Sequence, residues 1–224
     1  MKKGIMMQKL KSAGSLSDQA YDVIKNAIIN NEIKPLEYLT EEHLGEKLGI
    51  SRTPIRTALK RLVYEGLVEM ELNKQTRVRA ISIEEAQDYQ VLRESLEPLA
   101  AKLACITIDA EQLEFLKEIC IQQQESIVEK NFSQFINLDT QFHSYLAEFT
   151  NNHKLKEFIN SLRIQMQRYI ILTNTIRTSA TEAIEEHFQI ITALERKDPE
   201  EAATCMANHI KNISNRLGLT AKEE

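Results

Sequence analysis

Glycine and proline are scarce in this chain. The 224 residues include six glycines and four prolines, and no glycine occurs between residues 83 and 217. Three of the glycines, Gly45, Gly49 and Gly66, lie close together in the first third. Because these two residue types break helices and form turns, their distribution predicts a domain of short elements followed by a bundle of long helices.

Cysteine usage and the lack of long apolar runs exclude further classes of protein. Cys105, Cys120 and Cys205 are far apart, odd in number and form no CxxC pair, which argues against a disulfide framework or a cysteine-built zinc site. We expect each to be a small buried apolar residue. No apolar run approaches the roughly 18 residues that a membrane span needs. The basic start of the chain lacks an apolar core and a small-residue cleavage site, so we expect a flexible tail over residues 1–15 and a cytoplasmic protein without a membrane partner.

Negative charge dominates the chain, which by itself argues against nucleic-acid binding. The formal net charge is −5. Residues 1–80, however, hold 14 Lys and Arg against 10 Asp and Glu, a net of +4, whereas residues 81–224 hold 14 against 23, a net of −9. A basic N-terminal part is expected if only that part contacts phosphates, although a basic face is often only a solvated one.

Capping residues and glycines divide the first third into short elements. Ser51 can cap a helix that has Pro54 in its first turn and ends at Gly66, as the positional preferences of these residue types predict. The expected elements are a helix from Ser17-Asp18 to about Asn30, a loop over Asn31–Leu39, a helix from Thr40 to Gly49, a helix over Arg52–Glu65, and strands over Leu67–Leu72 and Thr76–Ile81. Two helices around a glycine turn, followed by a hairpin, predict a winged helix-turn-helix.

The segment LTEEHLGEKLGISRTPIRTALKRLVYEGLVEMELNKQTRV resembles the DNA-binding domain of the GntR family of transcription regulators. The likeness extends over residues 16–81 and is strongest in LGISRTPIRTALKRL, which is close to the family's signature. One departure is Pro35-Leu36, where members usually have Pro-Gly. The resemblance implies that residues 16–81 form a winged helix-turn-helix domain that binds a double-stranded DNA operator.

Two arginines at the start of the third helix are the candidate base readers. Arg52 and Arg56 lie four residues apart and share a face, and a planar guanidinium can pair with O6 and N7 of guanine. The resemblance implies that both contact bases or backbone; without it, such a pair is mostly a solvated helix face. Glu42 occupies a position where some FadR-like members have an arginine, so we assign it no base contact. The further candidate DNA contacts are Ser51, Thr53, Lys60 and Arg61, with Asn73, Lys74 and Gln75 at the tip of the wing.

The remainder of the chain, residues 82–224, has helical periodicity throughout. Six helices are expected, at about 83–106, 109–129, 132–150, 153–177, 181–196 and 199–217. This part resembles the FCD ligand-binding domain of the FadR-like branch of the same family. The likeness is carried by Arg93 and Glu97 in YQVLRESLEPLAAKLA, Asp139 and His143 in LDTQFHSYL, His187 in EEHFQIITALERKD and His209 in MANHI. The chain is therefore expected to be mainly α, with an N-terminal winged helix-turn-helix and a C-terminal all-α helical bundle.

Four polar side chains interrupt the apolar stripes of three of these helices. Asp139 and His143 are four residues apart on one face, His187 falls within the stripe of the fifth helix, and His209 lies at the edge of the last. A divalent metal would satisfy all four and leave positions open for water or a ligand carboxylate. A hydrogen-bonded core cluster is the alternative. The FCD resemblance implies that the four residues hold one divalent ion, with zinc, nickel and manganese all admissible.

The expected protein is a homodimeric, ligand-responsive DNA-binding regulator, a repressor rather than an activator, with a palindromic operator and no catalytic residues. Arg93, Arg163 and Arg168 are candidates for binding a small-molecule effector, a carboxylate by preference. For Arg163 and Arg168 the alternative is exposure to solvent, and for Arg93 a structural pair with Glu97. Three other functions stay open: a metal sensor in which the ion is the signal, a metal-dependent enzyme, and a helical protein-interaction module.

Overall fold

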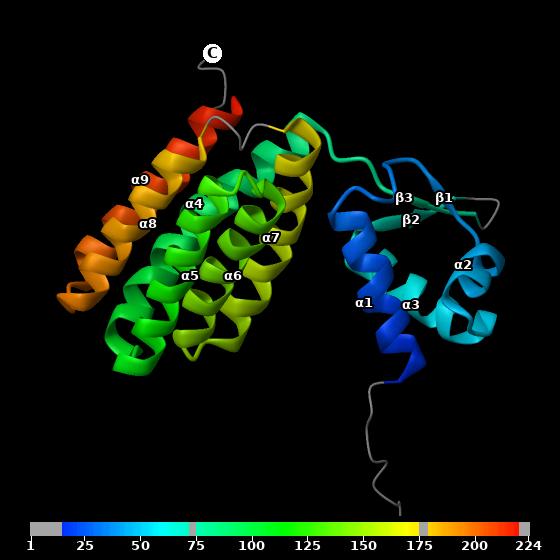
Figure 1. The fold of residues 1–224 in the computed structure, drawn as a ribbon, viewed down its shortest axis with the longest axis horizontal. Coiled ribbons are helices and arrows are strands. Elements are labelled where there is room, and N and C mark those ends of the chain that lie inside the picture. The colour runs from blue at the N-terminus through cyan, green and yellow to red at the C-terminus, as the bar shows by residue number, and fades with distance from the viewer. Residues whose placement is uncertain (1–14, 72–74, 175–178, 220–224) are drawn as a thin grey trace, which may run out of the picture. The chain divides into compact units, whose positions relative to one another are not determined.

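The computed structural model describes residues 15–71, 75–174 and 179–219. The chain divides into two compact units, one built around Ile33–Arg79 and the helix before it, the other holding the residues from Ala80 onward. Helices dominate the described residues, as the sequence predicts (Figure 1). None of the described helices combines the length and the apolar character that crossing a membrane requires.

The first unit is a three-helix domain with a small sheet. Its helices are α1 (Leu16–Ile29), α2 (Glu41–Leu48) and α3 (Arg52–Tyr64), and its strands are β1 (Tyr38–Leu39), β2 (Val68–Met70) and β3 (Thr76–Val78). Apolar residues of all three helices fill the interior, among them Ile24, Leu44, Ile55 and Leu62, together with Leu67 just before β2. This is the predicted winged helix-turn-helix: α2 and α3 are joined through Gly49, whose φ of 67° is the left-handed conformation that suits glycine.

Two details of this unit differ from the expectation. The cap of α1 is Ser15, not Ser17, since the Ser15 hydroxyl accepts from the Asp18 amide and the Asp18 carboxylate accepts from the Ser15 amide. The expected loop Asn31–Leu39 contains β1, which pairs antiparallel with β3 through Tyr38–Arg77 and Leu39–Thr76. A two-residue strand carries too little alternation to be recognised in a sequence. The hairpin β2–β3 is therefore part of a three-stranded sheet with the order β1-β3-β2, in which β3 is central.

Leu36 adopts a backbone conformation that favours glycine. Its φ is 66°, and its amide donates to the carbonyl of Val78 at 2.8 Å, so the turn into β1 depends on this geometry. An L-residue in the left-handed region costs roughly 1–2 kcal/mol. Leu36 thus adopts a left-handed conformation at the position where the resemblance leads us to expect glycine.

The second unit is a bundle of long helices. They are α4 (Ile83–Thr107), α5 (Ala110–Val128), α6 (Phe132–Phe149), α7 (His153–Thr173), α8 (Ala180–Glu195) and α9 (Pro199–Leu217). Helix α4 is central, packing against α6, α7, α8 and α9, and α8 lies alongside α9 (Figure 1). Side-chain caps fix the starts, as when Asp198 accepts from the Glu201 amide ahead of Pro199. The apolar core includes Phe135, Phe142, Leu146, Ile190 and Met206.

The cysteines differ in their surroundings. Cys105 and Cys120 are buried, as expected, whereas Cys205 is only half-buried. Burial raises the pKa of the Cys120 thiol to about 12, so this side chain stays protonated and behaves as an apolar residue. The Sγ of Cys205 lies 3.6 Å from a carboxylate oxygen of Glu201 and is not part of the histidine cluster.

Candidate metal centre and DNA-reading surface

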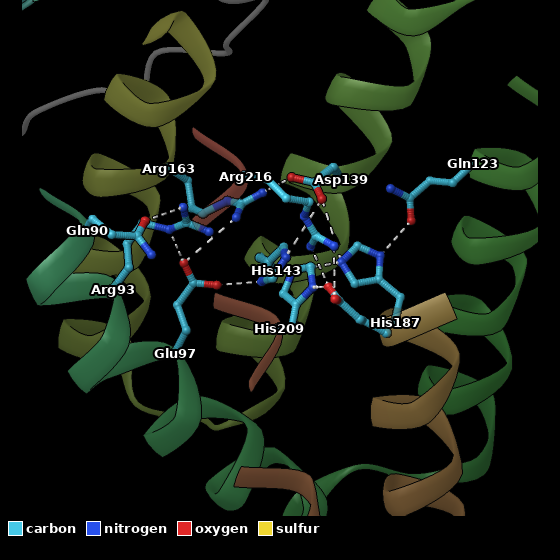
Figure 2. A network of polar contacts seen from close by, with 11 residues as sticks. Gln90, Arg93, Glu97, Gln123, Asp139, His143, Arg163, His187, His209 and Arg216 are labelled. Atoms are coloured by element: carbon cyan, nitrogen blue, oxygen red, sulfur yellow. Dashed lines mark hydrogen bonds and ion pairs between the residues drawn. The ribbon is translucent and has the colours of Figure 1, made fainter. Parts of the chain in front are cut away.

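Asp139, His143, His187 and His209 converge in the interior of the helical bundle (Figure 2). They come from α6, α8 and α9, and all four are buried, with His187 and His209 at 0% exposure. One donor atom from each can be chosen so that all lie within 4.8 Å of one another. The spacing of Asp139 and His143 places both on the inner face of α6, where apolar neighbours hold them away from solvent.

Each histidine has a separate acceptor behind it. His187 Nδ1 lies 2.9 Å from Gln123 Oε1 and His209 Nδ1 lies 2.8 Å from Glu186 Oε2. His143 Nδ1 approaches Glu97 Oε2 to 2.5 Å, without hydrogen-bond geometry. An acceptor at Nδ1 favours the tautomer that carries its hydrogen there and leaves a lone pair on Nε2. Partners of this kind commonly orient the histidine ligands of metal ions.

The Nε2 atoms face the shared space inside the cluster. His187 Nε2 lies 3.2 Å from His209 Nε2 and 3.6 Å from Asp139 Oδ1. His143 Nε2 lies 3.9 Å from the same oxygen and has no hydrogen-bond partner although it is buried. Three lone pairs and a carboxylate directed at one point form an arrangement that a cation would stabilise.

Burial and charge set the protonation states of this cluster. Burial and the nearby charge of Arg163 lower the pKa of His143 to about 4. Burial and the proximity of His209 lower the pKa of His187 well below its usual value. For Asp139, burial alone would raise the pKa, but Arg163 and the three histidines hold it below its ordinary range. The folded chain thus favours neutral imidazoles at His143 and His187 and an ionised carboxylate at Asp139, the states in which these groups bind metal.

These residues fit a divalent ion. Imidazole nitrogens bind zinc at about 2.0–2.1 Å, so two donors of one ion lie at most about 4.2 Å apart. The donor atoms lie within 4.8 Å of one another, so their separations would need to shorten by well under an ångström to meet this limit. The orphaned Nε2 of His143 and the facing pair His187–His209 would then each gain a partner. Three imidazoles and one carboxylate suit zinc, nickel or manganese, as the sequence suggested.

A chain of buried charges adjoins the cluster. Arg93 Nε donates to Glu97 Oε1 at 2.6 Å, and an Nη atom of Arg163 contacts Asp139 Oδ2 while its Nη1 lies 3.8 Å from Glu97. Arg93 and Glu97 are 0% and 1% exposed. Burial opposes ionisation of Glu97, but Arg93, His143 and Arg163 hold its pKa well below the ordinary value. The buried charges of Arg93, Glu97, Arg163 and Asp139 therefore stabilise one another away from water.

The three effector candidates are all buried. Arg163 and Arg168 are each 3% exposed, so the alternative of solvent exposure is wrong for both. All residues of α7 from 162 to 170 except Ile164 are buried, which the charged sequence of this helix does not reveal. Arg168 donates to Gln165 at 2.8 Å. Within the described residues, Arg93 Nη2 and Arg163 Nε are buried without a hydrogen-bond partner.

The candidate base readers Arg52 and Arg56 lie in the first two turns of α3, on its exposed side. Both are paired with carboxylates from the start of α2: Arg52 Nη2 donates to Glu42 Oε1 at 2.6 Å, and Arg56 donates from Nε and Nη2 to the two oxygens of Glu41, each at 2.7 Å. The buried side of α3 carries Ile55, Ala58, Leu59 and Leu62. The apolar face of α3 therefore packs into the domain core, and the opposite face leaves Arg52 and Arg56 accessible.

The other candidate DNA contacts lie in different settings. Ser51, Thr53 and Lys60 are exposed near the accessible side of α3; Ser51 occupies the N-cap position but makes no side-chain cap. Arg61 stacks over the Tyr21 ring at 3.6 Å from its centroid and lies within 3.6 Å of both Asp18 and Glu65. Asn73 and Lys74 lie outside the described residues, whereas Gln75 is described and exposed.

Sequence reasoning missed several residues that support these sites. Gln123 gave no signal, because a glutamine on a polar-rich helix has no distinguishing pattern. Glu186 directly precedes His187, yet only the packing of α8 against α9 brings it to His209. Its carboxylate also accepts hydrogen bonds from Arg216 at 2.7 Å and Asn212 at 2.8 Å. The contacts with His209, Arg216 and Asn212 lower the pKa of Glu186 to about 2, although burial alone would raise it.

Comparison with known proteins places the chain among transcription regulators. The Escherichia coli (strain K12) protein named HTH-type transcriptional repressor RspR is 23% identical over 206 residues, covering 92% of this chain and 90% of the relative. The Nta operon transcriptional regulator of Aminobacter aminovorans is 29% identical over 185 residues, covering 82% and 85%. The solved structure of E. coli McbR/YncC has a TM-score of 0.79 and 26% identity, covering 91% and 97%.

Two domain families match the two units. Residues 16–78 match the family described as bacterial regulatory proteins, gntR family, and residues 88–212 match the FCD domain. The resemblance seen in the sequence is therefore confirmed, and the chain belongs to the GntR family of DNA-binding transcription regulators, in the branch whose helical domain is an FCD domain.

Proposed function

We propose that this regulator is a ligand-responsive repressor whose FCD domain holds one divalent metal ion at Asp139, His143, His187 and His209. A small carboxylate would bind beside the ion as the effector. The single observation that carries this proposal is the convergence of three buried Nε2 atoms on one carboxylate, each histidine having its own acceptor behind it. A bound ion would supply a Lewis-acidic centre with open positions for an anionic ligand.

The buried arginines support an anionic effector. Arg93 Nη2 and Arg163 Nε are buried N–H donors without a hydrogen-bond partner, and an unsatisfied buried donor costs roughly 1–3 kcal/mol. A carboxylate at this end of the cluster would accept from such a donor. It would also compete with Asp139 and Glu97 for Arg163, so its binding would change contacts between α4, α6 and α7. This is how effector binding would alter the bundle.

Repression and dimerisation complete the proposal. RspR is named a repressor, as is the probable D-xylose utilization operon transcriptional repressor of Paenarthrobacter nicotinovorans, 26% identical over 202 residues. Helix α4 carries Leu92, Leu99 and Ile106, spaced seven residues apart, with exposed fractions of 49%, 42% and 65%. A second copy of the chain would cover this stripe, and two reading domains would then bind the half-sites of a palindrome.

The test combines metal content with DNA binding. Protein purified without chelator should contain close to one metal ion per chain by elemental analysis, and a chelator should remove it. A duplex selected from a random library should then be released by a small carboxylate only from metal-loaded protein. Release of DNA by metal alone would instead identify a metal sensor, and absence of metal after reconstitution would leave a hydrogen-bonded core cluster.

A further inference from the structure

The two recognition arginines differ in how firmly they are held. Arg56 meets Glu41 through two parallel hydrogen bonds, from Nε and Nη2, both 2.7 Å long. Arg52 meets Glu42 through one, from Nη2 to a single oxygen. The two arginines are about equally exposed, at 59% for Arg56 and 62% for Arg52, but the carboxylates differ, at 29% for Glu41 and 65% for Glu42. A two-point contact fixes the plane of a guanidinium, and a one-point contact between exposed groups does not.

Glu41 is itself held in place. It is the first residue of α2, directly after the N-cap Thr40, whose side chain accepts from the His43 amide. The positive end of a helix stabilises a carboxylate at this position. The hydrogen bonds from Arg56, with its charge and those of Arg52 and Lys60, hold the pKa of Glu41 below its ordinary value. Glu41 therefore stays ionised and offers both oxygens in a fixed orientation.

The contact also decides which edge of Arg56 remains free. A guanidinium has five N–H donors in one plane. With the Nε–Nη2 edge occupied by Glu41, the edge formed by Nη1 and the outer N–H of Nη2 is open. Such an edge presents two parallel donors, the pattern that pairs with O6 and N7 of guanine in the major groove.

We propose that Glu41 is a specificity-determining positioning residue: it fixes the Arg56 guanidinium so that its free edge reads a guanine. This inference rests on the base-reading role that the sequence predicts for Arg56. Glu41 should have the opposite effect on the affinity for DNA of arbitrary sequence. A carboxylate beside the recognition helix repels phosphates, so Glu41 weakens attachment to arbitrary DNA while it sharpens selection.

The experiment uses the full chain and four variants: Glu41→Gln, Arg56→Ala, the double variant, and Glu46→Gln. Glu46 is exposed on the same helix, one turn beyond Glu42, so its substitution makes the same charge change without altering the Arg56–Glu41 contact. A duplex selected by the parent protein from a library of random sequence is the specific probe, and the unselected library is the non-specific probe. Selectivity is the ratio of the two affinities, measured by fluorescence anisotropy.

Glu41→Gln should bind the unselected library about two- to threefold more tightly at low salt and lose about tenfold in selectivity. Glu46→Gln should share the first effect and not the second. In the Arg56→Ala background, Glu41→Gln should cause no further loss of selectivity, since the group that it orients is gone.

Three results would overturn the inference in distinguishable ways. If Arg56→Ala leaves selectivity unchanged, the proposed base-reading role fails and the inference fails with it. If Arg56→Ala lowers selectivity but Glu41→Gln does not, only the positioning role of Glu41 is wrong. If Glu41→Gln lowers the melting temperature and weakens both probes together, the residue is merely structural.

Discussion

His187 and His209 face each other through their Nε2 atoms, 3.2 Å apart, in the interior of the helical bundle. Behind each ring an acceptor lies at hydrogen-bond distance from Nδ1, Gln123 Oε1 for one and a Glu186 oxygen for the other. With both rings protonated at Nδ1, neither can donate to the other. The pair therefore gains most from a cation between them.

Replacing one member of this pair should abolish metal binding. We expect His187→Ala to lose the bound ion and, with it, any fall in melting temperature on addition of a chelator, because metal bound only to the folded chain stabilises it. His153→Ala, at the exposed start of α7, should keep both. Elemental analysis and thermal melts provide the measurements, and an unchanged metal content in His187→Ala would remove this residue from the site.

The carboxylate of Glu186 should tune the site through His209. Glu186→Gln keeps the shape of the side chain but weakens the acceptor for His209 Nδ1, and loss of such a partner typically lowers metal affinity about 10- to 100-fold. Glu185→Gln, its exposed neighbour, is the matched control. Competition with a chromogenic chelator measures both affinities. Equal affinities in the two variants would show that Glu186 supports only the packing of Arg216 and Asn212.

Stability of the metal-free protein should fall on mild acidification. The pKa of His143 is lowered from 6.5 to about 4 by burial and by Arg163, so between these values the unfolded chain binds a proton that the folded chain does not. The free energy of unfolding should therefore rise with pH across this window, by roughly 3 kcal/mol for this residue alone.

Glu186 extends the effect to lower pH. Its pKa is lowered from 4.5 to about 2 by hydrogen bonds that outweigh burial, so its stabilisation is present above pH 4.5 and is lost as the pH falls through 2.

Urea unfolding of chelator-treated protein between pH 4 and 7.5 measures the contribution of His143. His143→Gln should flatten the dependence and His153→Gln should not; a parent protein equally stable throughout would contradict the assignment.

A charge in the apolar stripe of α4 should separate the subunits. Leu99 lies in the middle of the stripe with Leu92 and Ile106, and burying an unpaired carboxylate against a second copy is costly. We expect Leu99→Glu to sediment as a monomer at micromolar concentration. Val128→Glu, which alters a residue that is 80% exposed at the end of α5, should leave the dimer intact. A monomeric parent protein would place the proposed dimer in error.

Relief of the backbone at Leu36 should stabilise the reading domain. Its φ of 66° suits glycine, and its side chain is 52% exposed, so Leu36→Gly loses little buried surface. The gain is limited by the larger conformational freedom of glycine in the unfolded chain, and we expect up to about 1 kcal/mol in the free energy of unfolding. Leu36→Ala, which retains the unfavourable φ, should show no gain. Urea unfolding distinguishes the two.

Local patterns were sufficient for much of this protein. Gly49 and Pro199 lie where the helix boundaries were expected, because caps and turns depend on a few adjacent residues. The periodicity of α6 likewise placed Asp139 and His143 on one inner face, because positions four apart share a side of any helix. The strand Tyr38–Leu39 escaped recognition because two residues cannot display an alternation.

The amino-acid sequence by itself therefore determined the order of the helices, the two-domain organisation of a GntR-family regulator and the four residues that converge in the bundle. Only the tertiary structure decided what surrounds them. Glu186 contacts His209, which lies 23 residues farther along the sequence, and Glu41 accepts hydrogen bonds from Arg56, 15 residues farther. Arg163 is buried rather than solvated. Each of these outcomes depends on how separate helices pack, and packing is a property of surfaces brought together from distant parts of the chain, which no local pattern contains.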